Sequence, residues 1–343
     1  GVELHMNDYC RRAVRTGCDL AEATGGTCTA ITLGPPEAHT VLREAILCGC
    51  AGGLHVSDPA FAGSDTLATA RALAGALEAH GPWDLVLCGR NSVDADTGQV
   101  PAQVAELLGL PFLSGVRELD LVKGTVRVLL EHDDEWVRAE VDLPAVLSCA
   151  ERLCDPCKIK EPEAWATVDA RLLTSITAAE IGPGLWGQAG SPTSVGEVRV
   201  LEVPRTGERL EGAGVEQVDR VVEVLRDRGA LVADDRPSDR VPEPSPDGHE
   251  VVVLVEPDRE RVAAELLAVA AGLGGRVTAI GIGATGELSE RGADRVLGVD
   301  GNPHEDDLAA LLADHLAVDP PWALLAPGTA WGRHVTSRLA ARL

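Results

Sequence analysis

The most informative part of the sequence for the fold is Leu87-Cys88-Gly89-Arg90-Asn91-Ser92-Val93-Asp94-Ala95-Asp96-Thr97-Gly98-Gln99-Val100-Pro101. A buried apolar strand is expected to end at Gly89, a polar loop follows, and a helix is expected to begin near Thr97. Asp96 or Thr97 can cap this helix, and Pro101 is tolerated in its first turn. The stretch therefore predicts free backbone N–H groups at the carboxyl edge of a parallel sheet, where α/β proteins bind phosphate.

Strand and helix patterns alternate around this stretch. Strands are expected at 27–33, 53–56 and 84–89, and helices at 9–22, 35–48, 65–79 and 97–109. Strands interleaved with helices predict an α/β fold with a doubly wound parallel sheet. Residues 116–122, 125–132 and 136–143 instead alternate apolar and polar side chains across short polar turns, which predicts antiparallel ribbons. Residues 150–214 are rich in Pro and Gly and are expected to be irregular.

The alternation restarts after an amphipathic helix expected at 215–228 and an acidic, Pro-rich linker at 234–249. Strands are then expected at 251–255, 276–282, 295–298 and 322–326, and helices at 259–272, 305–317 and from 332 onward. The two series look like repeats: 82–87 echoes 321–326, 29–31 echoes 278–280, and 52–56 takes the place of 295–299. We therefore expect one fold to occur twice, about a pseudo-twofold axis.

The repeat also exposes a difference between its two copies. The second copy opens with the strand at 251–255, whereas the first copy opens almost in its helix. The sequence starts at Gly1 and stops inside an expected helix at Leu343. These features predict that pieces are missing at both ends.

The length and composition of the chain indicate the number of domains and exclude some classes of partner. The chain has 343 residues, which predicts two domains, and a formal net charge of −24. Nucleic acids and anionic membranes need a basic surface, so neither is an expected partner. No apolar run approaches the ~18 residues that cross a bilayer. Nine cysteines, scattered in apolar runs, predict buried thiols in a reducing cytoplasm.

Several short motifs are similar to catalytic, metal-binding or dinucleotide-binding motifs. Cys154 and Cys157 form a CxxC pair, but a zinc site needs a second pair at suitable spacing, so structural thiols are expected. Gly281–Gly286 matches GxGxxG after a strand, but the helix expected after it is short, so a plain turn is favoured over a dinucleotide site. The histidines show no metal spacing, and no serine has a nucleophile-elbow context. No catalytic or metal-binding residue is expected.

The loop resembles the nucleotide loop of electron transfer flavoprotein beta subunits. Members that carry AMP there tend to read D-D-D-[SC]-x-Q-T, and bifurcating or Fix-type members, which hold a second FAD, tend to read D-G-D-T-A-Q-V. Asp94-Ala95-Asp96-Thr97-Gly98-Gln99-Val100 is closer to the second pattern, with Ala95 in place of its glycine. The resemblance implies AMP or a second FAD at this loop and leaves the choice open.

Shorter segments carry the same resemblance. Met6-Asn7-Asp8-Tyr9-Cys10 is similar to M-N-P-F-C before the family's first helix, which implies that Asn7 and Cys10 lie by the nucleotide and Tyr9 next to the flavin. Leu33-Gly34-Pro35 is similar to the family's second phosphate-edge turn, 143–146 to its L-P-A-V-V strand and 190–193 to its G-S-P-T. The expected cofactor-binding residues are Asn7, Asp8, Tyr9, Cys10, Leu33, Gly34, Gly89, Arg90, Asn91, Ser92, Val93, Asp94, Ala95, Asp96, Thr97, Gly98, Gln99 and Val100.

Residues 250–343 resemble the amino-terminal domain of the alpha subunit. Residues 292–296 are similar to G-A-D-K-V, and 325–333 to L-A-P-x-T-x-x-G-[KR]. The resemblance implies a beta-type domain with a carboxy-terminal arm at 1–232, a linker at 233–249 and an alpha-type domain at 250–343, as in a fusion whose halves pack together. The alpha domain that binds the main redox FAD in the family is not in the sequence, and the dehydrogenase-docking segment L-P-x-I-M-K-A is not recognisable.

The resemblance implies an electron carrier, not an enzyme, working between a flavin-linked dehydrogenase and an electron acceptor. Such a carrier needs no catalytic acid, only a flavin held close to a partner's cofactor. The alternative is an adenine-nucleotide-binding regulatory or hydrolytic module of the same superfamily. That module would need a G-x-x-G-x-x-x-x-G-[ST] or S-G-G-x-D loop, and neither occurs.

Overall fold

A computed structural model describes residues 5–92, 95–132, 135–159, 161–197, 199, 207–231, 248–283 and 286–343. The chain forms two compact units, one from residues 1–194 with 244–343 and one from 195–243. The second unit contains the helix α7 (Gly214–Asp227), which agrees with the amphipathic helix expected there. None of the described helices is both long and apolar enough to cross a membrane.

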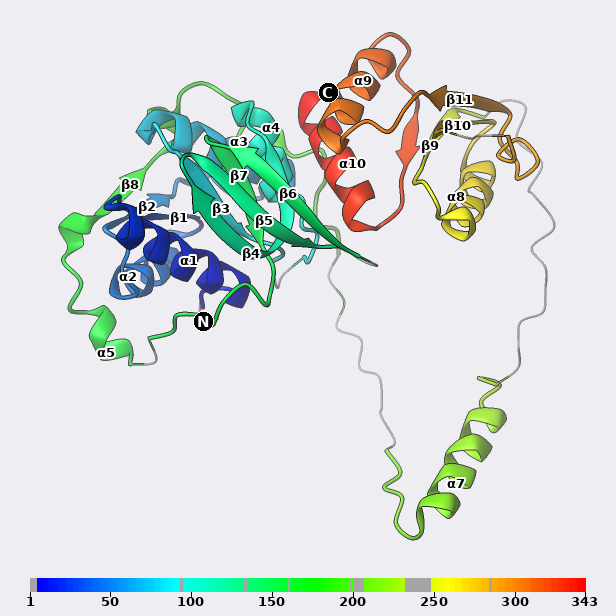
Figure 1. Cartoon of the computed structure of the whole chain (residues 1–343), viewed down its shortest axis with the longest axis horizontal. Helices are drawn as coiled ribbons and strands as arrows, with labels where there is room; N and C mark the ends of the chain where they lie inside the picture. The colour runs from blue at the N-terminus through cyan, green and yellow to red at the C-terminus, as the bar shows by residue number, and fades with distance from the viewer. Residues whose placement is uncertain are drawn as a thin grey trace. The chain divides into compact units, whose positions relative to one another are not determined.

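The amino-terminal part of the first unit alternates helices and strands as predicted (Figure 1). Its elements are α1 (Asp8–Thr24), β1 (Thr29–Leu33), α2 (His39–Leu47), β2 (Gly52–Val56), α3 (Thr66–His80), β3 (Leu85–Gly89) and α4 (Val100–Leu108). The strands β1 and β2 pair in parallel, in a three-stranded sheet of order β1-β2-β8. The predicted α/β fold with parallel sheets is confirmed.

A five-stranded mixed sheet of order β3-β7-β4-β5-β6 follows along the chain. Its further strands are β4 (Phe112–Val122), β5 (Thr125–Glu131), β6 (Trp136–Asp142) and β7 (Ala145–Cys149). The pairs β4–β5 and β5–β6 are antiparallel, which confirms the predicted ribbons, whereas β7 pairs in parallel with β3 and β4.

The expectation that residues 150–214 are wholly irregular is wrong at one strand and at two one-turn helices, α5 (Pro162–Trp165) and α6 (Ala178–Ile181). The strand β8 (Leu173–Ile176) pairs in parallel with β2, Gly53 lying opposite Leu173. It has only four residues, and two of these are exposed. A strand so short and so exposed has no apolar alternation to reveal it.

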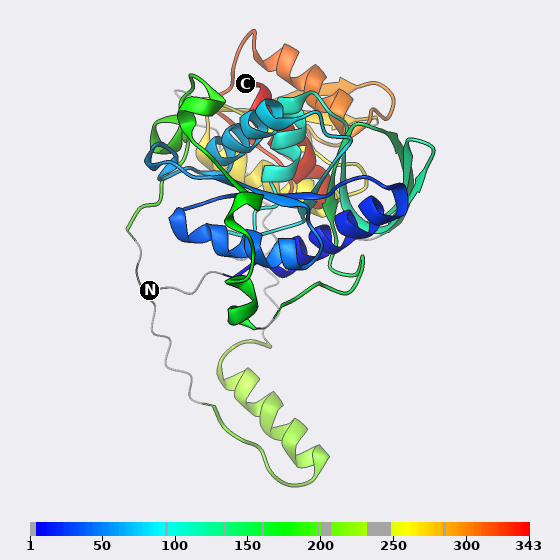
Figure 2. The same ribbon diagram turned by 90° about the vertical axis from the view of Figure 1, so that its left-hand side faces the viewer.

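Helices cover both faces of the parallel strands (Figure 2). The helices α1 and α2 pack on the side to which Cys28 and Ala30 point, with Cys10, Val14 and Cys18 in the same apolar cluster. The helices α3 and α4 pack on the opposite side, where Ile31 and Val86 lie. Successive side chains of a strand point to opposite faces, so each strand contributes to both layers.

The carboxy-terminal part of the first unit repeats this plan. Its elements are β9 (Glu250–Val255), α8 (Glu260–Leu273), β10 (Arg276–Ile282), β11 (Arg295–Val299), α9 (Glu305–Leu316), β12 (Ala323–Leu325) and α10 (Ala330–Arg342). The sheet is parallel, with the order β11-β10-β9-β12. Val251 and Val253 point toward α8, and Val252 and Leu254 point toward α9 and α10.

Strand register agrees with the repeat predicted at 29–31 and 52–56. In the first copy Thr29 lies opposite Gly52, and in the second Thr278 lies opposite Arg295. These are the positions that the sequence repeat equates. In the second copy β9 lies between β10 and β12. In the described part of the first copy no strand lies between β1 and β3, which belong to separate sheets.

A buried charge cluster joins α10 to α4 within the first unit. The side chains of Arg338 and Glu106 are 5% and 8% exposed, and Arg338 Nε lies 2.9 Å from Glu106 Oε2. The same Nε lies 3.1 Å from Asp306 Oδ1, and His334 Nε2 lies 2.9 Å from that oxygen. Arg342 also contacts Glu106. Charged groups so little exposed need partners of opposite sign, and here each has one.

The titration of the Asp306 carboxyl is expected to make the free energy of unfolding depend on pH. Burial opposes its ionisation, but the hydrogen bond with His334 and the charge of Arg338 outweigh burial and hold its pKa below the ordinary value. The folded state therefore prefers the carboxylate. The resulting stabilisation is present above the unfolded pKa of about 4 and is lost as the pH falls through the lower folded pKa.

Asp306→Asn should therefore lower the free energy of unfolding by roughly 1–3 kcal/mol at neutral pH. The gap to the wild type should close in acid, as measured by urea unfolding across a pH series. The matched control is Asp307→Asn, since Asp307 is an exposed carboxylate on the same helix. A gap for Asp306→Asn that persists below the folded pKa would show that the loss is steric.

Candidate functional site

The loop between β3 and α4 is the centre of the predicted site, and its helix begins later than expected. The helix α4 starts at Val100, with Gln99 as its N-cap and no capping side chain. The prediction that the helix begins at Thr97, capped by Asp96 or Thr97, is therefore wrong. Asp96 and Gly98 have φ of 51° and 64°, a left-handed conformation that interrupts a helix. Pro101 does lie in the first turn, as expected.

Short polar contacts hold the loop closed on itself. The Asp96 N–H donates to the Ser92 carbonyl at 3.0 Å, and Asn91 Nδ2 donates to Asp96 Oδ1 at 2.6 Å. A Cβ added at Gly98 would lie 2.8 Å from Asn91 Oδ1, so the chain passes close over this side chain. The carboxylate of Asp96 therefore serves the loop itself. Val93, Asp94 and their contacts lie outside the described residues.

Two residues at the end of the loop complete its attachment. Gln99 Oε1 accepts a hydrogen bond from the Thr66 hydroxyl at 2.9 Å, which ties the loop to α3. The Thr97 hydroxyl accepts from the Gln99 N–H at 3.5 Å. Both side chains are thus engaged within the protein, although the sequence predicted them as ligands of the nucleotide.

The start of α4 has backbone N–H groups without an acceptor in the described part of the chain, although Ala102 is buried. In the described part of the chain, no acceptor takes a hydrogen bond from the N–H of Val100 or Ala102, and Pro101 between them has none to give. The first amides of a helix carry the positive end of its dipole and attract anions. Arg90, half-buried at the other end of the loop, adds a positive charge. This arrangement can hold a phosphate.

The turn that opens α1 lies directly against this loop. Asn7 Oδ1 accepts from the Tyr9 N–H at 2.8 Å and caps α1, while Asn7 Nδ2 donates to the Asn91 carbonyl at 3.0 Å. A Cβ at Gly89 would lie 2.9 Å from both the backbone N and the Sγ of Cys10. Two segments that the sequence singled out separately, 7–10 and 89–100, are therefore brought together.

The third predicted segment is placed elsewhere. Leu33 ends β1, and the Gly34 N–H donates to the Val56 carbonyl at 3.1 Å. Within the described ranges, no hydrogen bond joins Leu33 or Gly34 to residues 89–100. These two residues belong to the edge of the other sheet, so their role in the same site stays a prediction.

The thiols near the loop are neutral at physiological pH. Burial raises the pKa of Cys10, against a weaker opposing effect of a hydrogen bond with the Gly89 backbone. Burial also raises the pKa of Cys88 to about 12. A neutral buried thiol is a small apolar group and a poor nucleophile. Cys10 can therefore line a ligand site without reacting.

A small cavity beside the loop involves residues that sequence reasoning missed. It has a volume of about 20 Å³ and is lined on one side by Arg90, Asn91 and Gly98. Its other lining residues include Ser114 on β4 and Arg333 and His334 on α10. No local motif marks these positions, because they reach the loop only through the fold. The cavity holds about one water molecule, so it cannot enclose an adenosine.

The cysteines Cys48 and Cys157 form a disulfide, with their Cα atoms 6.0 Å apart. The prediction that all cysteines are reduced thiols is therefore wrong for this pair. The physical reason is proximity created by the fold, since the two residues are 109 positions apart. The spacing of cysteines along the sequence does not predict the Cys48–Cys157 pairing.

Replacing Asn7 tests the link between the α1 turn and the loop. Asn7→Ala removes both the helix cap and the bond to the Asn91 carbonyl, so we expect a loss of roughly 2 kcal/mol of unfolding free energy. Asn7→Asp keeps a capping oxygen but loses the donor, so it should lose about half as much. Urea unfolding measures both variants. An Asn7→Asp variant as stable as the wild type would show that the contact with Asn91 contributes nothing.

Comparisons with known proteins bear on the same region. A family model described as "Electron transfer flavoprotein domain" matches residues 1–175, which include both segments of the site. The electron transfer flavoprotein subunit beta of Thermoanaerobacterium thermosaccharolyticum is 33% identical over 233 residues, covering 67% of this chain and 89% of that protein.

Two further relatives are subunits of larger assemblies. A subunit of the caffeyl-CoA reductase–Etf complex of Acetobacterium woodii is 32% identical over 223 residues, covering 64% of this chain and 84% of that protein. The acryloyl-CoA reductase electron transfer subunit gamma of Anaerotignum propionicum is 31% identical over 233 residues, covering 64% of this chain and 85% of that protein.

Proposed function

Because this chain belongs to the electron transfer flavoprotein family, we propose that its α1 turn and its β3–α4 loop together hold the adenine nucleotide of an electron carrier. Electron transfer is the role that the family and its relatives support. The redox chemistry of such a protein is supplied by a bound flavin. The contribution of the chain itself is to bind and orient the nucleotide, and we propose that it transforms no substrate.

The observation that carries this proposal is the set of unpartnered N–H groups at the start of α4. The unpartnered N–H groups of Val100 and Ala102 suit a phosphate, which accepts several hydrogen bonds. Gly98 has no side chain to keep a phosphate from the backbone. Ser92, Ala95 and Asp96 are exposed, so the outer side of the loop is accessible to a group too large for the 20 Å³ cavity.

The nucleotide is AMP or FAD. Both present the same phosphate and adenosine chemistry to the loop. The pattern of residues 94–100 favours FAD, and Ala95 in place of glycine favours AMP. Asn7 and Cys10 would line the nucleotide, with Tyr9 toward a flavin, as the resemblance of this turn implies.

We further propose that residues 250–343 are an alpha-type domain fused after a beta-type domain, which spans 1–232, with a linker at 233–249. The shared strand register of β1–β2 and β10–β11 supports this, since both copies are built on one plan. The buried contact between Arg338 and Glu106 supports packing of the two halves.

The expected partners are a flavin-linked dehydrogenase or reductase that donates electrons and a downstream acceptor. The relatives from Acetobacterium woodii and Anaerotignum propionicum are named for reductases of CoA thioesters, which supports a partner of that general kind. A cytoplasmic location would suit such partners.

Nucleotide binding by a pair of glycine variants tests the proposal. Gly98 and Gly109 lie at opposite ends of α4 with φ of 64° and 65°, so alanine is strained equally at both. Only at Gly98 would the new Cβ meet a neighbour, 2.8 Å from Asn91 Oδ1. We expect both variants to lose about 1 kcal/mol of stability and only Gly98→Ala to bind AMP or FAD about tenfold more weakly in calorimetry. Equal affinity in the two variants would argue against the loop as the site.

A further inference from the structure

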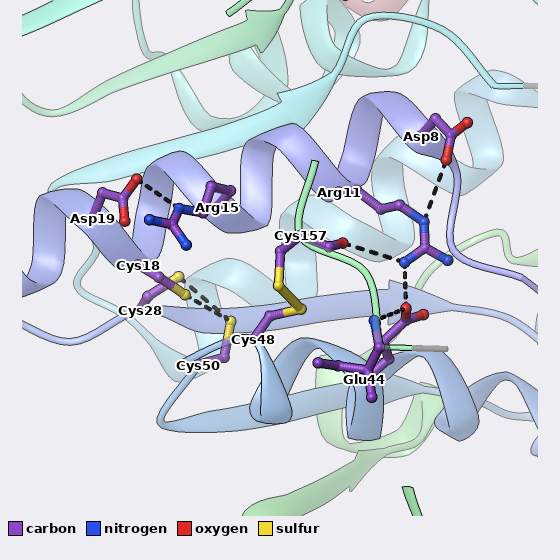
Figure 3. Close-up of a disulfide and its surroundings, with 11 residues drawn as sticks. Asp8, Arg11, Arg15, Cys18, Asp19, Cys28, Glu44, Cys48, Cys50 and Cys157 are labelled. Carbon is purple, nitrogen blue, oxygen red and sulfur yellow. Dashed lines mark hydrogen bonds and ion pairs between the residues drawn. A yellow bond between two sulfur atoms is a disulfide. The ribbon is translucent and has the colours of Figure 1, made fainter. Parts of the chain in front are cut away.

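Three cysteine side chains converge at a place that the nucleotide site does not use. Cys18 lies on α1, Cys28 directly precedes β1, and Cys50 lies two residues before β2. The Sγ of Cys50 is 3.8 Å from that of Cys18 and 3.6 Å from that of Cys28, and all three sulfur atoms lie within 4.8 Å of one another. Figure 3 shows the three thiols pointing toward one another beside the disulfide.

These separations match those of a thiolate metal site. A zinc ion binds thiolate sulfur at about 2.3 Å in tetrahedral geometry, which places its sulfur ligands about 3.8 Å apart. The two measured separations of 3.8 and 3.6 Å equal this value within a few tenths of an ångström. One ion at the centre would therefore contact all three sulfur atoms with little movement of the chain.

The backbone around the thiols is held in place. The Cys50 N–H donates to the Ala45 carbonyl at 3.1 Å, and the Ala51 N–H donates to the Cys28 carbonyl at 2.8 Å. Two glycines leave the room that the sulfur atoms occupy. A Cβ at Gly17 would lie 2.9 Å from Cys28 Sγ, and one at Gly49 would lie 3.3 Å from Cys18 Sγ. A preorganised set of ligands loses little entropy when an ion binds.

We propose that Cys18, Cys28 and Cys50 form a binding site for one thiophilic metal ion of the zinc class, with water as its fourth ligand. A cavity of about 400 Å³ adjoins the cluster and is lined by Cys18 and Cys28, so solvent reaches the fourth position. Soft thiolate ligands select zinc or Cu(I) over magnesium or calcium. Three protein ligands with one open position form an arrangement that zinc accepts.

The surrounding charges suit such an ion. The charged side chains that line the cavity are Arg15, Asp19 and Glu22, and this net negative lining attracts cations toward the thiols. Arg15 also pairs with Asp19, Nε to Oδ2 at 2.9 Å, which fixes its position (Figure 3). Cys48, also in the cavity lining, is bonded to Cys157, so it is not available as a fourth thiolate.

The metal site is separate from the proposed nucleotide site. Cys28 and Cys50 precede the amino ends of β1 and β2, whereas Gly89 and its loop follow the carboxyl end of β3. Cys10 of the proposed nucleotide site and Cys18 lie eight residues apart on α1, which separates them by about 12 Å along the helix. The two sites can therefore be tested independently.

Metal binding by the full chain tests this proposal. The protein, purified in oxygen-free buffer without reductant so that the disulfide survives, should take up one Co²⁺ per chain with sulfur-to-cobalt charge-transfer absorption, and Zn²⁺ should displace it. Cys18→Ser, Cys28→Ser and Cys50→Ser should each weaken binding on the order of a hundredfold or more, since loss of even an outer partner costs up to that factor. Cys154→Ser, which removes a free thiol outside the cluster, should bind as the wild type does.

Alkylation of the wild type provides a readout that does not depend on how the variants fold. Zinc should protect the partly exposed Cys18 and Cys28 from iodoacetamide, and a chelator should restore their reaction. Nucleotide binding should be unchanged by zinc. Absence of the charge-transfer band, equal binding by Cys154→Ser and the three cluster variants, or a disulfide within the cluster in freshly purified protein would each overturn the proposal.

Discussion

Gly89→Val is expected to weaken nucleotide binding by roughly tenfold to a hundredfold while the chain remains folded. Gly89 ends β3, where a Cβ would lie 2.9 Å from the Cys10 backbone N and 3.0 Å from Tyr9 Cβ. The branched side chain must displace the α1 turn and break the bond from Asn7 to the Asn91 carbonyl. Such overpacking costs about 1–3 kcal/mol, and a like loss of binding energy weakens affinity by roughly tenfold to a hundredfold.

Calorimetric titration with AMP and with FAD measures the effect, and urea unfolding reports the stability. The control is Gly272→Val, since Gly272 is an exposed glycine with no atom within 4 Å of an added Cβ. It should leave nucleotide affinity unchanged. Wild-type affinity in Gly89→Val would mean that the α1 turn and the loop do not act together.

Glu44→Ala should produce the largest loss of stability predicted for this chain. Glu44 on α2 pairs with Arg11 on α1, and their side chains are 1% and 3% exposed. Glu44 Oε1 also accepts from the Ile159 N–H at 3.1 Å, and Arg11 donates to the Cys157 carbonyl at 3.3 Å. Removing the carboxylate leaves the buried guanidinium with the exposed carboxylate of Asp8, 3.3 Å from Arg11 Nε, so we expect a cost of about 3 kcal/mol, the lower end for breaking a buried ion pair.

The double replacement Arg11→Met with Glu44→Met separates the charge effect from packing. Apolar side chains of similar volume can replace a buried ion pair at little cost, so the double variant should regain most of the lost stability. Urea unfolding of the single and double variants gives the comparison. If the double variant is as unstable as Glu44→Ala, the unpaired charge is not the cause.

Many of the helices and strands could be predicted from the sequence, because the spacing of apolar residues indicates which face of an element is buried. The strand expected at 276–282 is β10 without change of bounds, and the segments equated by the predicted repeat take corresponding positions in the pairs β1–β2 and β10–β11. The errors have local causes. The strand β8 is too short and too exposed to show a pattern, and the start of α4 is delayed by two left-handed residues, Asp96 and Gly98.

Only those segments of the site that contain a recognisable sequence motif could be predicted. The loop and the α1 turn each showed one, and the contact between Asn7 and Asn91 brings them together. Arg333 and His334 could not be predicted, because they lie more than 200 positions from the loop and reach it through packing of α10. The thiol cluster was missed for a similar reason, since 18, 28 and 50 match no metal-ligand spacing.

The small molecule that leaves the protein on denaturation should show whether the chain holds an adenine nucleotide. The chain, purified without added nucleotide, is denatured and the filtrate is analysed by mass spectrometry. We expect a stoichiometric amount of AMP or FAD, and a rise in melting temperature when that nucleotide is added back to protein stripped of it. A filtrate without any adenine nucleotide, together with a melting temperature that neither AMP nor FAD changes, would contradict this expectation.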